Sequence, residues 1–180
     1  MNERNVMDNR CVRPYFERLA VYLNYNIRGE IKMITKDFSY LEFEQSDKAR
    51  ELGINNAIES QAIKNAIKSL VDSVLQPLRD AWGKPLAINS GYRCKELNAA
   101  VGGVPTSQHV KGEAADVCPF GRNGHGDIKV VTELARLAVK LDLPFDQMIL
   151  YPSFVHFSHK AKGEQRKQIL YNKSYKGEKV

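Results

Sequence analysis

Four residues of the chain have side chains of the types that bind divalent metal ions, at spacings that could bring them together. His109 and Asp116 lie seven residues apart across a glycine turn, and His156 and His159 lie on one expected strand. Because side chains alternate along a strand, only one of the last two can face a given site. A neutral histidine pair with one carboxylate leaves zinc an open position for water, as in catalytic rather than structural sites. A surface hydrogen bond between His109 and Asp116 is the alternative, and His125 is expected to be a loop residue.

Several short motifs surround these residues in a fixed order. The motifs are SGYRC at 90–94, LNxxVGG at 97–103, SxHxxGxAxD at 107–116, FDQ at 145–147 and VHxS at 155–158. Together they resemble the M15 family of zinc peptidases, of the D-alanyl-D-alanine carboxypeptidase and L-alanyl-D-glutamate endopeptidase type, found among bacterial cell-wall enzymes and phage endolysins. The resemblance covers about residues 34–171.

The resemblance implies which residues bind the metal and the substrate. It implies that His109, Asp116 and His156 hold one zinc ion per chain, and that Arg93 faces the substrate. We expect Ser107, the first residue of the SxHxxGxAxD motif, to contact substrate as well. The planar fork of donors on Arg93 suits a carboxylate such as a terminal D-alanine or a γ-linked glutamate. An ordinary salt bridge is the alternative for Arg93.

The sequence departs from the family pattern at the general base. Many members have an acid three residues before the last histidine, where this chain has Ser153. Asp146 and Glu113 are the remaining candidates. Strand alternation places Glu113 on the face opposite to Asp116, so we expect Asp146 to be the general base. A structural cap at the start of a strand, beside Pro144, is the alternative for Asp146.

Hydrophobic periodicity predicts the elements that must position these residues. Apolar residues three and four apart predict an amphipathic helix over about 62–82, with a kink at Pro77, and a second helix over about 127–141. Helices come first and strands cluster later, which predicts an α+β fold: a small antiparallel sheet carrying the zinc site, packed against N-terminal and crossover helices. The expected strands are 85–90, 113–118, 146–151 and 153–159, with a short helix at 94–101 and a hairpin strand at 167–171.

The 180 residues are enough for one domain. We expect a peripheral extension over 1–32, with Met33 as an alternative start, then a peptidase domain over 33–172 and a basic tail over 173–180. The net charge is +6, and residues 160–180 contribute +5 of it, from seven basic and two acidic side chains. This charge favours anionic partners, unless it only solubilises the chain. No nucleic acid is expected, because no recognised nucleic-acid motif accompanies the charge.

The sequence also suggests where the protein acts. It has no secretory signal and no apolar run of about 20 residues, so no integral membrane segment is expected. The three cysteines form no CxxC pair and are expected to be reduced thiols. We therefore expect a monomer made in the cytoplasm that acts on the cell wall after release, like a phage lysin, or after non-classical export.

Together the motifs predict zinc-dependent hydrolysis of peptide bonds in peptidoglycan stem peptides, because zinc polarises a carbonyl and lowers the pKa of bound water. The missing acid at Ser153 leaves an alternative function. In that alternative the chain is a non-catalytic module that contains zinc and binds peptidoglycan without turnover.

Overall fold

The computed structural model describes two stretches of the chain, residues 32–119 and 127–180. The predicted extension over 1–32 lies outside them except for its last residue, and His125 lies outside them as well. In the part of the chain that is described, no helix is both long and apolar enough to cross a membrane.

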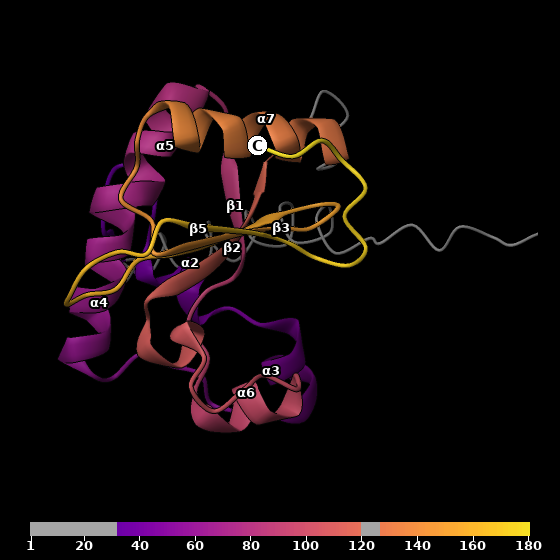
Figure 1. The fold of residues 1–180 in the computed structure, drawn as a ribbon. Coiled ribbons are helices and arrows are strands. Elements are labelled where there is room, and N and C mark those ends of the chain that lie inside the picture. Colours follow the sequence, from indigo (N-terminus) through magenta and orange to yellow (C-terminus); the bar gives the residue numbers. More distant parts are fainter. Residues whose placement is uncertain (1–31, 120–126) are drawn as a thin grey trace, which may run out of the picture.

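Five strands form one sheet in the order β1-β2-β4-β3-β5 (Figure 1). The neighbours β1–β2, β2–β4 and β3–β4 are antiparallel, and β3–β5 is parallel. The prediction of an α+β fold with a small, mostly antiparallel sheet is therefore confirmed. The strands are β1 (Leu86–Ser90), β2 (Ala114–Pro119), β3 (Gln147–Leu150), β4 (Val155–Ser158) and β5 (Gln168–Tyr171).

The predicted hairpin at the end of the chain is wrong. β5 does not pair back on β4 but runs parallel to β3, with Gln147 opposite Gln168 and Leu150 opposite Tyr171. The reason is that β4 already pairs with β2 on one edge and with β3 on the other, so it has no edge left. The loop 159–167 therefore crosses to the far edge of β3.

The helices lie around this sheet. α4 and α5 follow each other in one rod, joined by the π-helical turn η2 (Val71–Leu75), which ends just before Pro77 in the first turn of α5. Proline has no N–H to donate, and the irregular turn falls where the sequence predicts a kink. Figure 1 shows this rod beside the sheet, α7 across one end of it, and α3 and α6 at the opposite end. The helices are α2 (Tyr40–Glu44), α3 (Asp47–Leu52), α4 (Gln61–Leu70), α5 (Gln76–Trp82), α6 (Lys95–Ala100) and α7 (Ile128–Lys140).

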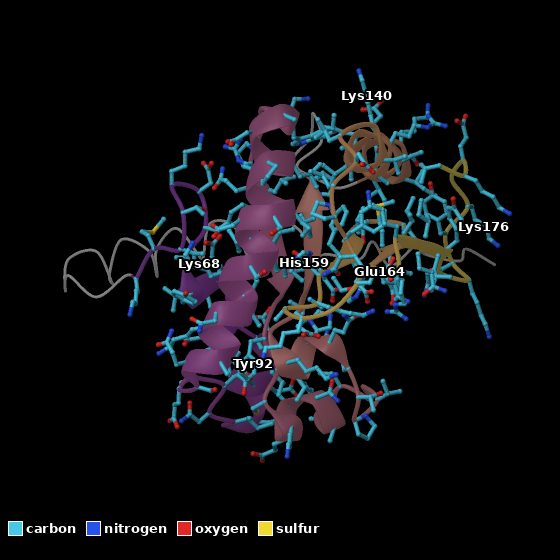
Figure 2. The ribbon with its side chains drawn as sticks, turned by 60° about the vertical axis from the view of Figure 1, so that its left-hand side comes forward. Lys68, Tyr92, Lys140, His159, Glu164 and Lys176 are labelled. Carbon is cyan, nitrogen blue, oxygen red and sulfur yellow. The ribbon has the colours of Figure 1, made fainter. Side chains whose placement is uncertain are left out.

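The core lies between the helices and one face of the sheet. Side chains fill this space, whereas Lys68 on α4 and Lys140 at the end of α7 point outward (Figure 2). Because side chains alternate, the residues between the core-facing ones lie on the other face, where Asp116 and His156 are found. The buried strand residues of the core are Leu86, Ile88, Ala115, Val117, Met148, Leu150, Val155 and Phe157.

The short 3₁₀-helix η3 (Gln108–Lys111) is pressed closely against α4. It ends at Gly112, which has a positive φ of 71° and lies so close to Ile63 that a Cβ atom there would be 2.9 Å from Ile63 Cγ2. Only glycine combines this left-handed conformation with so little space. Gly112 therefore fixes where η3 sits on the core.

Two residues of the basic tail expected over 173–180, Tyr175 and Val180, pack on the core of the domain. Tyr175 belongs to the hydrophobic core, and its hydroxyl lies 2.6 Å from Thr132 Oγ1 of α7. The same hydroxyl donates a hydrogen bond to the Glu178 carbonyl. The lysines of this segment predict an exposed tail, but the aromatic ring of Tyr175 anchors the segment to the core.

The fit of Gly112 predicts that Gly112→Ala destabilises the protein more than Gly83→Ala does. Both glycines have a positive φ, but a Cβ at Gly83 meets nothing within 4 Å. We expect Gly83→Ala to cost about 1–2 kcal/mol through backbone strain alone. Gly112→Ala should cost a further 1–3 kcal/mol, roughly, from crowding against Ile63. Urea unfolding of both variants measures the difference, and equal midpoints would contradict the close packing of η3 on α4.

Candidate metal centre

The three expected zinc ligands come from three different elements. Asp116 lies on β2 and His156 on β4, and the two are direct partners in the antiparallel register. Side chains of directly opposed residues lie on one face, about 5 Å apart. His109 comes from η3, whose N-cap Ser107 accepts a hydrogen bond from the His109 backbone N–H. The position of η3 beside β2 and β4 therefore brings His109 next to Asp116 and His156.

Their donor atoms converge on one point. His156 Nδ1 lies 2.8 Å from Asp116 Oδ1, His109 Nε2 lies 3.3 Å from His156 Nδ1, and His109 Nε2 lies 3.4 Å from Asp116 Oδ1. Ligands about 2.0–2.1 Å from a tetrahedral zinc ion lie roughly 3.3 Å from one another. Two nitrogens and one carboxylate oxygen at these separations fit zinc, and they leave one position of the tetrahedron to solvent or substrate.

Hydrogen bonding fixes the tautomer of His109. Its Nδ1 lies 2.7 Å from the carbonyl oxygen of Gly91, which can only accept, so Nδ1 has the proton and Nε2 keeps its lone pair for the metal. Burial lowers the pKa of His109, which favours the neutral ring that a metal needs. The backbone carbonyl of Gly91, in the SGYRC segment, thus orients the ring of His109.

Arg93 lies directly beside the donor cluster. Its Nη2 donates to Asp116 Oδ2 at 3.0 Å, and its Nε donates to Ser90 Oγ at 2.9 Å. Burial raises the pKa of Asp116, but the nearby rings of His109 and His156 together lower it by more, so that it lies well below the usual range. Asp116 is therefore ionised at neutral pH, with Oδ1 toward the histidines and Oδ2 toward Arg93.

The donor cluster lies in a cleft of about 720 Å³ on the face of the sheet away from the core. Arg93 and Ser107, the two expected substrate contacts, both line it. Ser107 has the additional structural role of capping η3, described above. Cationic side chains outnumber acidic ones in the lining, which contains Arg93, Lys111, Lys160, Lys162 and Arg166 against Glu113, Asp116 and Asp146.

The structure does not support the expectation that Asp146 accepts a proton. The residue is fully buried, and Arg166 and Lys160 donate to its carboxylate at 2.5 and 2.9 Å. Gln108 Nε2 and the Arg166 backbone N–H also donate to it, at 3.2 and 3.0 Å. Burial raises the pKa of Asp146, but these donors outweigh burial and hold the pKa well below its usual range. We assign Asp146 the role of an anchor that holds one wall of the cleft.

Glu113, the other candidate for the general base, and His159, the other candidate for a metal ligand, also have structural partners. Glu113 lines the cleft and accepts a hydrogen bond from the Ala161 backbone N–H through Oε1. His159, the other histidine expected on this strand, is buried, and its Nδ1 donates to the Pro144 carbonyl at 2.6 Å. It takes no part in the donor cluster. The sequence does not indicate the ion pairs of Asp146, because Lys160 and Arg166 lie in a basic segment that is typical of exposed surface charge.

The convergence of the three donors predicts that the purified protein holds about one zinc ion per chain. His109→Ala or His156→Ala should lose this ion, because two remaining donors do not hold zinc in an open site. His159→Gln, which keeps a side-chain donor for the Pro144 carbonyl, is the matched control and should retain zinc. Metal analysis after gel filtration gives the content. Full occupancy in His156→Ala would refute the assignment.

The contacts of Asp146 predict that Asp146→Asn destabilises the protein. Its two cationic partners are partly exposed and can turn to water, so we expect a moderate loss of about 1–3 kcal/mol at pH 7. Because the pKa of Asp146 is depressed on folding, its contribution is present above about pH 4 and is lost as the pH falls further. The stability difference between wild type and Asp146→Asn should therefore shrink on acidification, as measured by denaturant unfolding at several pH values. A general base would instead give equal stability with turnover lowered about 10²–10⁴-fold.

Comparison with known proteins agrees with this geometry. The model of the Peptidase M15 family matches residues 36–158, more than half of the chain, and this range includes all three metal-binding candidates. A zinc D-Ala-D-Ala carboxypeptidase of Streptomyces albus G is 34% identical over 82 residues, which are 45% of this chain and 31% of that relative. The match thus spans about a third of the relative's length. The chain belongs to the M15 family of peptidases.

Proposed function

We propose that this protein is a zinc-dependent peptidase that hydrolyses peptide bonds in peptidoglycan stem peptides. The observation that supports this proposal most directly is the cluster of His109, Asp116 and His156 at the floor of an open cleft. Membership of the M15 family supports peptide-bond hydrolysis. The similarity to a zinc D-Ala-D-Ala carboxypeptidase, whose name states its substrate, supports the same reaction and a substrate of the peptidoglycan type.

Zinc, when bound, polarises a peptide carbonyl and makes water nucleophilic near neutral pH. The protein's own residues prepare the site for this chemistry. Gly91 orients His109, and Arg93 donates to Asp116, which holds the Arg93 guanidinium next to the donor cluster. The side chain of Arg93 is only 18% exposed, so its charge acts at the floor of the cleft.

The charge of the cleft supports a carboxylate-rich substrate. Asp116 faces the metal donors and Asp146 is paired with Lys160 and Arg166, so two of the three acids in the lining are already compensated. Lys111 and Lys162 are exposed at the rim. Stem peptides have several free carboxylates, which such a cleft attracts.

Digestion of purified sacculi by the zinc-loaded protein tests this proposal. We expect new muropeptide fragments, identified by mass spectrometry, whose masses give the bond that is cut. His109→Ala should produce none, and His159→Gln should match the wild type. Binding to sacculi without any fragment would favour the alternative of a non-catalytic peptidoglycan-binding module. Absence of both binding and fragments would contradict the substrate class.

A further inference from the structure

Tyr151 is a cleft residue that has no part in the metal cluster. It follows β3 directly, and strand alternation places it on the cleft face: Met148 and Leu150 are buried in the core, whereas Ile149 and Tyr151 line the cleft. Ile149 is the direct partner of His156. Tyr151 is the next residue after Ile149 on the same face of the strand. It therefore lies about 7 Å along the strand from the residue that is paired with His156.

The order of the strands places Tyr151 and Arg93 on opposite sides of the donor cluster. Arg93 follows β1, Asp116 lies on β2, His156 lies on β4 and Tyr151 follows β3, and these strands are neighbours in that order. A peptide bond held over the cluster thus has Arg93 on one side and Tyr151 on the other. Both residues line the same cleft.

The ring of Tyr151 is held in place. It stacks on Phe154 with centroids 4.2 Å apart and planes 13° from parallel, and its backbone N–H donates to the Phe154 carbonyl at 3.0 Å. Phe154 in turn packs against Ala87 and Cys118. A ring fixed in this way loses little side-chain entropy when its hydroxyl binds a substrate.

The hydroxyl of Tyr151 keeps the proton that it would donate. Burial raises the pKa of Tyr151, and the nearby charge of Asp116 raises it further, whereas the side chain of Asn172 lowers it by less. The phenol is therefore protonated at neutral pH, and a protonated hydroxyl can donate a hydrogen bond.

We propose that Tyr151 is a further catalytic residue, whose hydroxyl donates a hydrogen bond to the scissile carbonyl oxygen of the bound peptide. The inference rests on the proposed function. Negative charge grows on this oxygen as the carbonyl carbon is attacked, so a fixed donor stabilises the transition state more than the substrate. Arg93, on the other side of the cluster, remains available for a substrate carboxylate.

The variant Tyr151→Phe tests the proposal, because it keeps the stacked ring and removes only the hydroxyl. We expect kcat on a stem peptide to fall about 10²-fold, the usual effect of removing one such donor, with KM and zinc content unchanged. A phosphinate peptide analogue mimics the charged tetrahedral oxygen, and calorimetry should show that it binds the variant more weakly by a similar factor. Tyr40→Phe is the matched control, because the Tyr40 hydroxyl contacts the Lys64 carbonyl and Tyr40 does not line the cleft.

The possible outcomes are distinct. Unchanged kcat and unchanged analogue affinity in Tyr151→Phe, with an active wild type, would overturn the role of Tyr151 and leave the proposed function intact. A loss of zinc or of melting temperature that accounts for the lost activity would overturn it too, because Tyr151 would then be structural. A wild type that cuts no stem peptide would overturn the proposed function, and the role of Tyr151 with it.

Discussion

The register between β2 and β4 is the constraint on which the metal centre depends. It sets Asp116 directly opposite His156, and the flanking residues Val117 and Phe157 hold both strands in this register because they are buried in the core. A slip of one residue would turn one ligand into the core and expose an apolar side chain, so packing on one face enforces the chemistry on the other.

The third ligand depends on close contacts between backbone segments. His109 reaches the cluster because η3 rests against α4, which Gly112 permits, and because the Gly91 carbonyl accepts a hydrogen bond from His109 Nδ1–H. Gly91 itself lies so close to Phe43 that a Cβ would be 2.6 Å from the Phe43 Cα. The glycines of the two motifs therefore serve the position of one imidazole ring.

The path of the chain after β4 decides the charge of the cleft. With both edges of β4 occupied, the loop 159–167 crosses β3 to reach its far edge, and this crossing brings Lys160 and Arg166 onto Asp146. The buried carboxylate holds the two cations at the wall of the cleft. Asp146, expected from the sequence to be the general base, thus holds positive charge at the cleft instead.

The sequence alone indicated the candidate metal ligands and most of the elements. The motifs that resemble the M15 family implied His109, Asp116 and His156 as metal ligands, and the helices expected over about 62–82 and 127–141 followed from apolar residues three and four positions apart. Only the tertiary structure decided the partners of Asp146, the packing of Tyr175 and the parallel pairing of β5. These depend on contacts between segments far apart in the chain, such as Asp146 with Arg166 and Tyr175 with Thr132. Local sequence patterns do not indicate which distant side chain pairs with a given charge. Such pairs depend on the order of the strands in the sheet, which decides which loops lie next to each other.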